Sequence, residues 1–246
     1  METDVVKIDR NTKLVAMDLD GTLTQHKSPL EPECQKVLEE LARRYCLIMV
    51  CAGGCERIYQ QLEFFPIDII GYYGMQLSTT LGGKLVILEN DAIPVDKEAV
   101  LKCAEAIRIE FDLLDYAGDS IEFHSSGLIT FPILGTAAKL NEKLLYDPDR
   151  AKRRQYLSRV KEDFCEYTVF IGGTSSFDIV PRPYSKLYAL ENYLNKAGIN
   201  RECAIYFGDD YGIGGNDRDV YESDIWFIEI DNYKSFPSDA RKLLLS

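Results

Sequence analysis

Two short apolar segments, each ending in acidic residues, constrain the fold of this chain more than any other feature of its sequence. The first reads V-A-M-D-L-D-G-T-L-T over residues 15–24, and the second reads A-I-Y-F-G-D-D over residues 204–210. Uninterrupted apolar runs of this length are typical of strands buried on both faces of a parallel sheet. Because ligands bind beyond the carboxyl ends of such strands, we expect the two acidic motifs to lie at a ligand site.

The segments around these motifs alternate between strand and helix patterns, which favours an α/β core with a parallel, Rossmann-like sheet. After the third expected strand, the pattern predicts a hairpin with Gly82-Gly83 as its turn. We expect strands at 13–17, 46–51, 68–71, 204–207 and 224–230, and helices at 32–44, 55–62, 186–197, 217–222 and from Pro237.

The middle of the chain has a different pattern. Apolar runs near residues 121–124, 128–133, 167–171 and 177–180 are separated by short glycine- and serine-rich turns, and helical patterns cover about 96–111 and 148–164. Strands joined in this way favour an antiparallel sheet with helices on one face. We therefore predict an inserted α+β cap domain at 89–184, which divides the core domain into 1–88 and 185–246.

The acidic motifs and a lysine suit phosphoryl transfer. Asp18, at the end of a buried strand, is the expected nucleophile, because a carboxylate can form an aspartyl phosphate and divide one displacement into two easier ones. Asp20 is the expected general acid and base, since a tight turn at Gly21 would point it across the same pocket. Lys186 is the expected ammonium that neutralises the acyl phosphate.

The same carboxylates fit Mg²⁺, a hard cation that prefers oxygen ligands. We expect Asp18 to contribute its side chain, Asp20 its backbone carbonyl and Asp209 a carboxylate. Asp210 and Asp217 fit either as further ligands or as residues that orient water molecules around the ion.

The composition of the chain limits the classes of partner that we expect it to bind. The net charge of −12 argues against a nucleic-acid surface, and we place the short Lys152-Arg153-Arg154 run on a solvated helix face. No apolar stretch approaches the roughly 18 residues that cross a bilayer, and no secretory signal opens the sequence, so we expect a cytoplasmic protein without a membrane partner. Seven scattered cysteines indicate reduced thiols. An exposed sheet edge in the cap would allow a homodimer.

The motifs resemble those of the haloacid dehalogenase superfamily, in its class with an α/β cap (Cof-type, subfamily IIB). Within it, the chain is most similar to the eukaryotic-type phosphomannomutases, through I-E-F-H-S-S-G-L-I-T at Ile121, G-G-T-S-S-F-D-I-V-P at Gly172 and F-G-D-D-Y-G-I-G-G-N-D-R-D-V-Y at Phe207. The resemblance implies a Mg²⁺ cofactor and the catalytic roles given above. It also implies that Ser176 and Asp178 contact a sugar, although both also fit a solvated strand face.

The chain departs from this family where phosphate is held. Arginines of the family are replaced by Lys27, His124, Thr136 and Lys143, and of these Lys27, His124 and Lys143 remain candidates for substrate binding. His124 fits a plain surface position equally well. The hydroxyl residue that the superfamily carries after its second strand is replaced by Ala52 or Cys55, so the backbone of Gly53 and Gly54 is the expected phosphate cradle.

A mutase must hold a bisphosphorylated sugar, which favours arginine forks in the cap. Their loss leads us to expect a Mg²⁺-dependent phosphatase acting on a small phosphorylated metabolite, most simply a sugar phosphate, through an aspartyl phosphate. A phosphomannomutase-like phosphosugar mutase is the alternative. A silent sugar-phosphate-binding protein is the third hypothesis, and the complete set of Asp18, Asp20, Lys186 and Asp209 argues against it.

Overall fold

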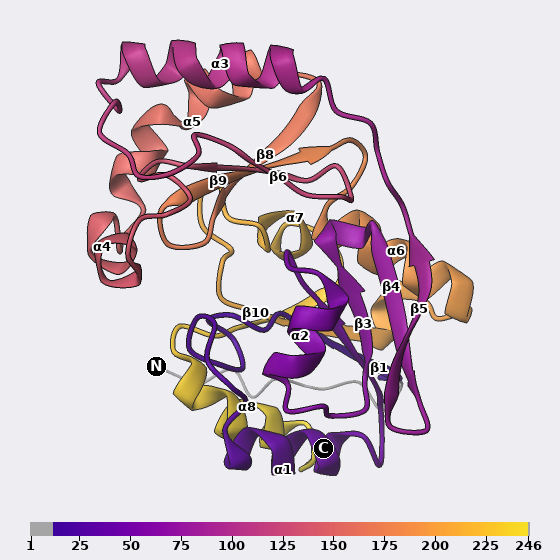
Figure 1. Ribbon diagram of the computed structural model, residues 1–246. Helices are drawn as coiled ribbons and strands as arrows, with labels where there is room; N and C mark the ends of the chain where they lie inside the picture. Colours follow the sequence, from indigo (N-terminus) through magenta and orange to yellow (C-terminus); the bar gives the residue numbers. More distant parts are fainter. Residues whose placement is uncertain (1–11, 246) are drawn as a thin grey trace. The chain divides into compact units, whose positions relative to one another are not determined.

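The computed structural model describes residues 12–245 and divides into two compact units, shown in Figure 1. The first unit comprises the described chain up to Glu89 together with Lys186–Asp210 and the residues from Asp219 onward. The second comprises Asn90–Ser185 and Tyr211–Arg218. The sequence had placed the insertion at 89–184, and each unit is described below by itself.

The first unit is built on a seven-stranded sheet in the order β11-β10-β1-β2-β3-β4-β5. The pairs from β11 to β3 are parallel, and β4 runs antiparallel to β3 before a turn at Gly82-Gly83 leads into β5. The strands are β1 (Leu14–Met17), β2 (Cys46–Val50), β3 (Asp68–Gly71), β4 (Gln76–Leu81), β5 (Lys84–Asn90), β10 (Ala204–Gly208) and β11 (Trp226–Glu229).

Helices cover both faces of this sheet, which explains why β1 is apolar at every position. Val15 and Met17 pack in a cluster with α1, α2 and α8, while Leu14 and Ala16 pack in another with α6 and α7. The helices are α1 (Pro32–Leu41), α2 (Cys55–Gln61), α6 (Lys186–Ala197), α7 (Arg218–Tyr221) and α8 (Phe236–Lys242), with short 3₁₀ turns at Tyr72–Gly74, Arg201–Cys203 and Tyr233–Ser235. Because β1 is buried on both faces, the chain leaves the core at the first residue after this strand, Asp18.

The second unit contains a separate sheet (Figure 1). Its strands are antiparallel and follow the order β6-β7-β9-β8. Its core is formed where α3 and α5 pack on one face of this sheet, against Ile129, Phe131, Phe177 and Ile179. The elements are α3 (Lys97–Glu110), β6 (Glu122–Phe123), β7 (Ile129–Pro132), α4 (Leu140–Tyr146), α5 (Ala151–Asp163), β8 (Tyr167–Gly172) and β9 (Ser176–Pro181). The fold is therefore the mixed α/β architecture that the sequence predicts.

Two features of the second unit differ from expectation. The helix α4 was not predicted, and none of its residues is buried. Arg153 does not lie on a solvated helix face, because it is only 1% exposed and pairs with Asp147 at 2.8 Å (Nε to Oδ2). Its Nη1 also donates to the carbonyl oxygens of Gly172 and Ser176, so this arginine joins the start of α5 to the β8–β9 turn.

Among residues 12–245, no helix combines the length and the apolar character that crossing a membrane requires.

Candidate active site

Asp18 and Lys186 form a buried ion pair at the carboxyl end of β1. The backbone N–H of Asp18 donates to the Phe207 carbonyl at 2.9 Å, which extends the pairing of β1 with β10 by one residue and fixes where Asp18 emerges. Lys186 begins α6, is fully buried, and places its Nζ 3.0 Å from Asp18 Oδ1. Asp18 itself is 7% exposed. A carboxylate in this position is oriented by a fixed cation and can be reached by a ligand over a small area.

Asp209 reaches the same place from β10. It follows Gly208, the last residue of that strand, and its Oδ1 accepts a 2.8 Å hydrogen bond from the hydroxyl of Thr22. Gly21 makes this approach sterically feasible, because it has φ +103° and a Cβ there would lie 2.4 Å from Asp209 Oδ2. The glycine after the first acidic pair is thus required both by its backbone conformation and by the carboxylate packed against it.

Asp18, Asp209 and Asp217 form a cluster that can hold a metal ion. Each offers one carboxylate oxygen, and these three oxygens lie within 4.8 Å of one another. Asp217 immediately precedes α7, so it comes from the loop that follows β10. Three carboxylate oxygens form a hard donor set that suits Mg²⁺. Asp210, the residue after Asp209, is buried. The contribution expected from Asp20 is its backbone carbonyl, not its carboxylate.

The carboxylate of Asp20 is held by a separate group of donors. Its Oδ1 accepts hydrogen bonds from Gln61 Nε2 at 2.8 Å and from the backbone N–H of Lys27 at 2.7 Å. Its Oδ2 lies 3.3 Å from both Nη1 and Nη2 of Arg57. Burial raises the pKa of Asp20, but the Arg57 guanidinium and the Gln61 amide outweigh this and hold the pKa below its usual value.

Arg57 and Gln61 were missed by the sequence reasoning. They lie four residues apart on α2, the helix that follows β2, so both side chains emerge on the same face of the helix. That spacing, directly after the second strand of the sheet, was the signal in the sequence. Lys27 was expected to bind substrate through its side chain, whereas the structure gives it a backbone contact with Asp20 and an exposed side chain.

The loop of Gly53 and Gly54, the expected phosphate cradle, is closely packed. A Cβ on Gly53 would lie 2.1 Å from Arg57 Nη2, and a Cβ on Gly54 would lie 2.7 Å from the ring of Tyr72. Cys55 does not replace the hydroxyl in this loop, because its Sγ lies 3.4 Å from the carbonyl oxygen of Ile69 in the core. The guanidinium of Arg57 therefore lies over Gly53, and the ring of Tyr72 lies over Gly54.

In the second unit, four polar side chains share the sheet face opposite the helices. Residues alternate across a strand, so Ser176 and Asp178 point away from the core side chains Phe177 and Ile179. Thr130 is the register partner of Asp178, and its Oγ1 lies 3.0 Å from His124 Nε2. The structure thus groups three residues predicted to bind substrate, and adds Thr130.

Lys143, the fourth residue predicted to bind substrate in this unit, lies apart on α4. Its Nζ donates to the carbonyl of Thr136 at 3.1 Å, and the Thr136 hydroxyl accepts from the backbone N–H of Asp119 at 2.8 Å. Both residues make local contacts that support the loop before α4.

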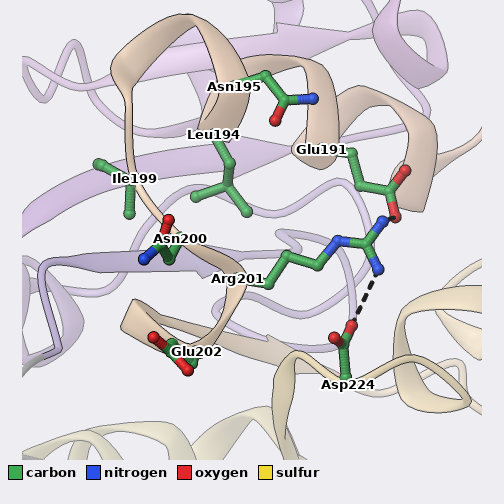
Figure 2. Close-up of a pocket in the computed structure, with 8 residues that line it drawn as sticks. All are labelled: Glu191, Leu194, Asn195, Ile199, Asn200, Arg201, Glu202 and Asp224. Carbon is green, nitrogen blue, oxygen red and sulfur yellow. Dashed lines mark hydrogen bonds and ion pairs between the residues drawn. The ribbon is translucent and has the colours of Figure 1, made fainter.

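A pocket of about 580 Å³ lies elsewhere in the first unit (Figure 2). Arg201 crosses it and pairs with Glu191 and with Asp224, the latter at 3.0 Å. The turn Arg201–Cys203 directly precedes β10, whereas Asp209 follows the end of that strand. This pocket therefore lies at the other end of β10 from Asp209, and none of the residues that line it is a predicted site residue.

Comparison with known proteins gives consistent results. The model of the family "Eukaryotic phosphomannomutase" matches residues 98–244. A phosphomannomutase of Saccharomyces cerevisiae is 28% identical over 240 residues, which cover 94% of this chain and 92% of the relative. One from Drosophila melanogaster is 27% identical over 249 residues, covering 96% of each.

The similarity to solved structures concerns the fold. An IMP-bound, N-terminally truncated IMP-nucleotidase of Plasmodium falciparum superposes with a TM-score of 0.74 at 11% identity, covering 98% of this chain and 70% of that one. This match shows that the two proteins share a fold.

Proposed function

This chain belongs to the eukaryotic phosphomannomutase family, and on that premise we propose that it is a phosphosugar mutase that moves a phosphoryl group between positions of a hexose phosphate such as mannose phosphate. The observation that carries the proposal is the buried Asp18–Lys186 pair beside the acidic cluster. The family membership and the named relatives support this reading better than the simple phosphatase expected from the sequence.

In this proposal Asp18 is the nucleophile. A carboxylate oxygen of Asp18 forms a bond to phosphorus while the bond from phosphorus to the sugar oxygen breaks, which leaves an aspartyl phosphate. Lys186, 3.0 Å from Asp18, neutralises charge that would otherwise repel the incoming phosphate. In the second step a hydroxyl of the acceptor sugar attacks phosphorus and releases Asp18.

Asp20 moves the protons. It gives a proton to the departing sugar oxygen in the first step and takes one from the attacking hydroxyl in the second. Gln61 and the backbone N–H of Lys27 fix the orientation of its carboxylate. Mg²⁺ held by Asp18, Asp209 and Asp217, with the Asp20 carbonyl and Asp210 close by in the sequence, would supply charge neutralisation for the transferring group.

The sugar would be recognised by the polar sheet face of the second unit. Ser176 and Asp178 offer hydroxyl and carboxylate groups that suit sugar hydroxyls, and His124 with Thr130 extends the same face. Lys143 was also predicted to bind substrate. Because its ammonium already donates to the Thr136 carbonyl, it is a weaker candidate for this role than Ser176 or Asp178.

Hydrolysis is the second candidate, and a specific observation favours it. At two positions where family arginines would grip the far phosphate of a bisphosphorylated sugar, Thr136 and Lys143 make local contacts instead. Without a planar fork in these places the cap holds a second phosphate less firmly. Water would then replace the sugar hydroxyl as the acceptor in the second step.

One experiment separates the two candidates. The purified chain is incubated with mannose-1-phosphate, a hexose bisphosphate and Mg²⁺, and mannose-6-phosphate and inorganic phosphate are both measured over time. The mutase predicts that mannose-6-phosphate accumulates faster than phosphate. Free mannose and phosphate as the main products would replace this conclusion with hydrolysis, and D18N, which removes the nucleophile, should abolish both reactions.

A further inference from the structure

Arg57 is a cation at the candidate site to which the proposed mechanism gives no role. Its guanidinium lies beside two parts of the site, since Nη1 and Nη2 are each 3.3 Å from Asp20 Oδ2 and a Cβ on Gly53 would lie 2.1 Å from Nη2. Gln61 Oε1 accepts a further hydrogen bond from Nη1 at 2.6 Å. These contacts hold the guanidinium over the Gly53-Gly54 loop.

Arg57 lies at the same end of the sheet as the Asp18–Lys186 pair. It belongs to α2, which begins shortly after the end of β2, and β2 pairs in parallel with β1, the strand that leads to Asp18. Lys186 pairs with Asp18 at that end.

The negative charge of the candidate site favours a second cation in addition to Lys186. Asp18, Asp209 and Asp217 converge, with the ammonium of Lys186 beside Asp18, and a phosphate monoester would add still more negative charge. The loop C-A-G-G-C at 51–55 has no hydroxyl side chain, and the Cys55 thiol faces the core. A guanidinium presents parallel N–H donors that match two oxygens of a phosphate.

We propose that Arg57 binds the transferring phosphate of the substrate and exchanges its contact with Asp20 for that phosphate when substrate enters. The inference rests on the proposed function, because that function brings a phosphate against Asp18. The contact with Asp20 is suited to such an exchange, since the side chain of Arg57 is 40% exposed and both its N–O distances are 3.3 Å, longer than a strong charge-assisted bond. The exchange also leaves Asp20 with its bonds from Gln61 and Lys27.

Binding of inorganic phosphate to the full chain with Mg²⁺, measured by calorimetry, tests this role without turnover. R57Q is expected to weaken phosphate binding about 10- to 100-fold, the loss typical of charge-assisted hydrogen bonds, and R57K to recover part of it. Q61A removes a donor to Asp20 and also the acceptor of one Arg57 N–H, so it measures the effect of positioning and should weaken phosphate binding less than R57Q does. R43A removes an exposed arginine of the same unit and should have no effect.

Two results would overturn the proposal. One is wild-type phosphate affinity in R57Q, and the other is an equal loss in R43A, because the effect of R57Q would then reflect net charge alone. Thermal unfolding of each variant checks that the fold is kept, and R57K provides the same test with the charge retained. Absence of mannose phosphate turnover in the wild-type chain would reject the proposed function but not Arg57 as a phosphate ligand, which the binding assay judges separately.

Discussion

At the scale of single residues, the candidate site depends on close approaches that tolerate little change. Gly21 admits the Asp209 carboxylate, and Gly53 admits the Arg57 guanidinium. In both places a glycine lies where a charged side chain from a distant part of the sequence passes over the backbone. The residue types in the first motif were evident from sequence, but the identity of the side chain that each glycine accommodates was not.

Replacing Gly21 by alanine is expected to displace Asp209 and weaken Mg²⁺ binding, because the added Cβ would meet the carboxylate at 2.4 Å. We expect the Mg²⁺ concentration for half-maximal activity to rise at least about tenfold, equivalent to about 1.4 kcal/mol. G82A is the matched control. Gly82 also has positive φ but has no atom within 4 Å of its added Cβ, so it carries the backbone strain without the displacement. An equal change in both variants would contradict this reading of Gly21.

Lys186 gives a second prediction at this scale. K186M keeps most of the side-chain volume but removes the ammonium 3.0 Å from Asp18. We expect kcat to fall by at least about a hundredfold, because the charge of the acyl phosphate is no longer neutralised. K196M, which removes an exposed ammonium from the same helix, should leave kcat unchanged. A kcat in K186M close to the wild-type value would exclude the role assigned to Lys186.

At the scale of elements, α5 depends on one buried contact. Asp147 accepts hydrogen bonds from the backbone N–H groups of Lys152 and Arg153 as well as from the Arg153 side chain. The carboxylate thus satisfies the first turn of the helix and compensates a buried guanidinium. The basic run at 152–154 predicted an exposed helix face, and this was wrong for Arg153 because the run itself does not reveal a partner six residues earlier, at Asp147.

D147A is expected to destabilise the second unit by about 3–5 kcal/mol, since it leaves Arg153 buried without its carboxylate. Denaturant unfolding followed by circular dichroism measures the change. D149A is the control, because Asp149 is exposed and accepts a single bond from the Ala151 N–H. D149A should lower the free energy of unfolding by less than about 1 kcal/mol. If the two variants were equally stable, the buried pair would contribute no more than an ordinary cap.

The same pair predicts a pH dependence. Burial raises the pKa of Asp147, but the bonds from Arg153 and from the backbone outweigh it and hold the pKa below its usual value. The folded form therefore binds its proton less readily than the unfolded form. The stabilisation is complete above the unfolded pKa of about 3.9 and is lost as the pH falls through the lower, folded pKa. D147N should lose less stability than the wild type between pH 5 and pH 3, when both are measured by denaturant unfolding.

At the scale of the whole molecule, the site unites segments that are remote in sequence. The order β11-β10-β1-β2-β3 places β10 beside β1, so Asp18 and Asp209 meet although 190 residues separate them. Carboxylates gathered in this way repel one another unless a cation is present. Mg²⁺ is therefore expected to stabilise the folded chain by mass action.

Thermal unfolding tests that effect. Millimolar MgCl₂ should raise the Tm by several degrees relative to NaCl at equal ionic strength, and D209N should lose most of the increase because it removes one carboxylate of the cluster. D239N, which changes a partly buried acidic residue of α8 outside the cluster, should keep it. A Tm shift in D209N as large as in the wild type would place the effect of Mg²⁺ outside the cluster.

The sequence by itself determined the alternation of strands and helices, the α/β core with its antiparallel insertion, and the residue types of the first motif, because periodicity and turn chemistry depend on near neighbours. It missed α4, whose residues are not buried, so no core pattern marked it. Only the tertiary structure decided that Arg57 lies on Asp20, that Thr130 joins the polar face with Asp178, and that Arg153 is buried. Each of these depends on which distant strands and helices pack together, and that packing brings side chains into contact without leaving a local pattern around any one of them.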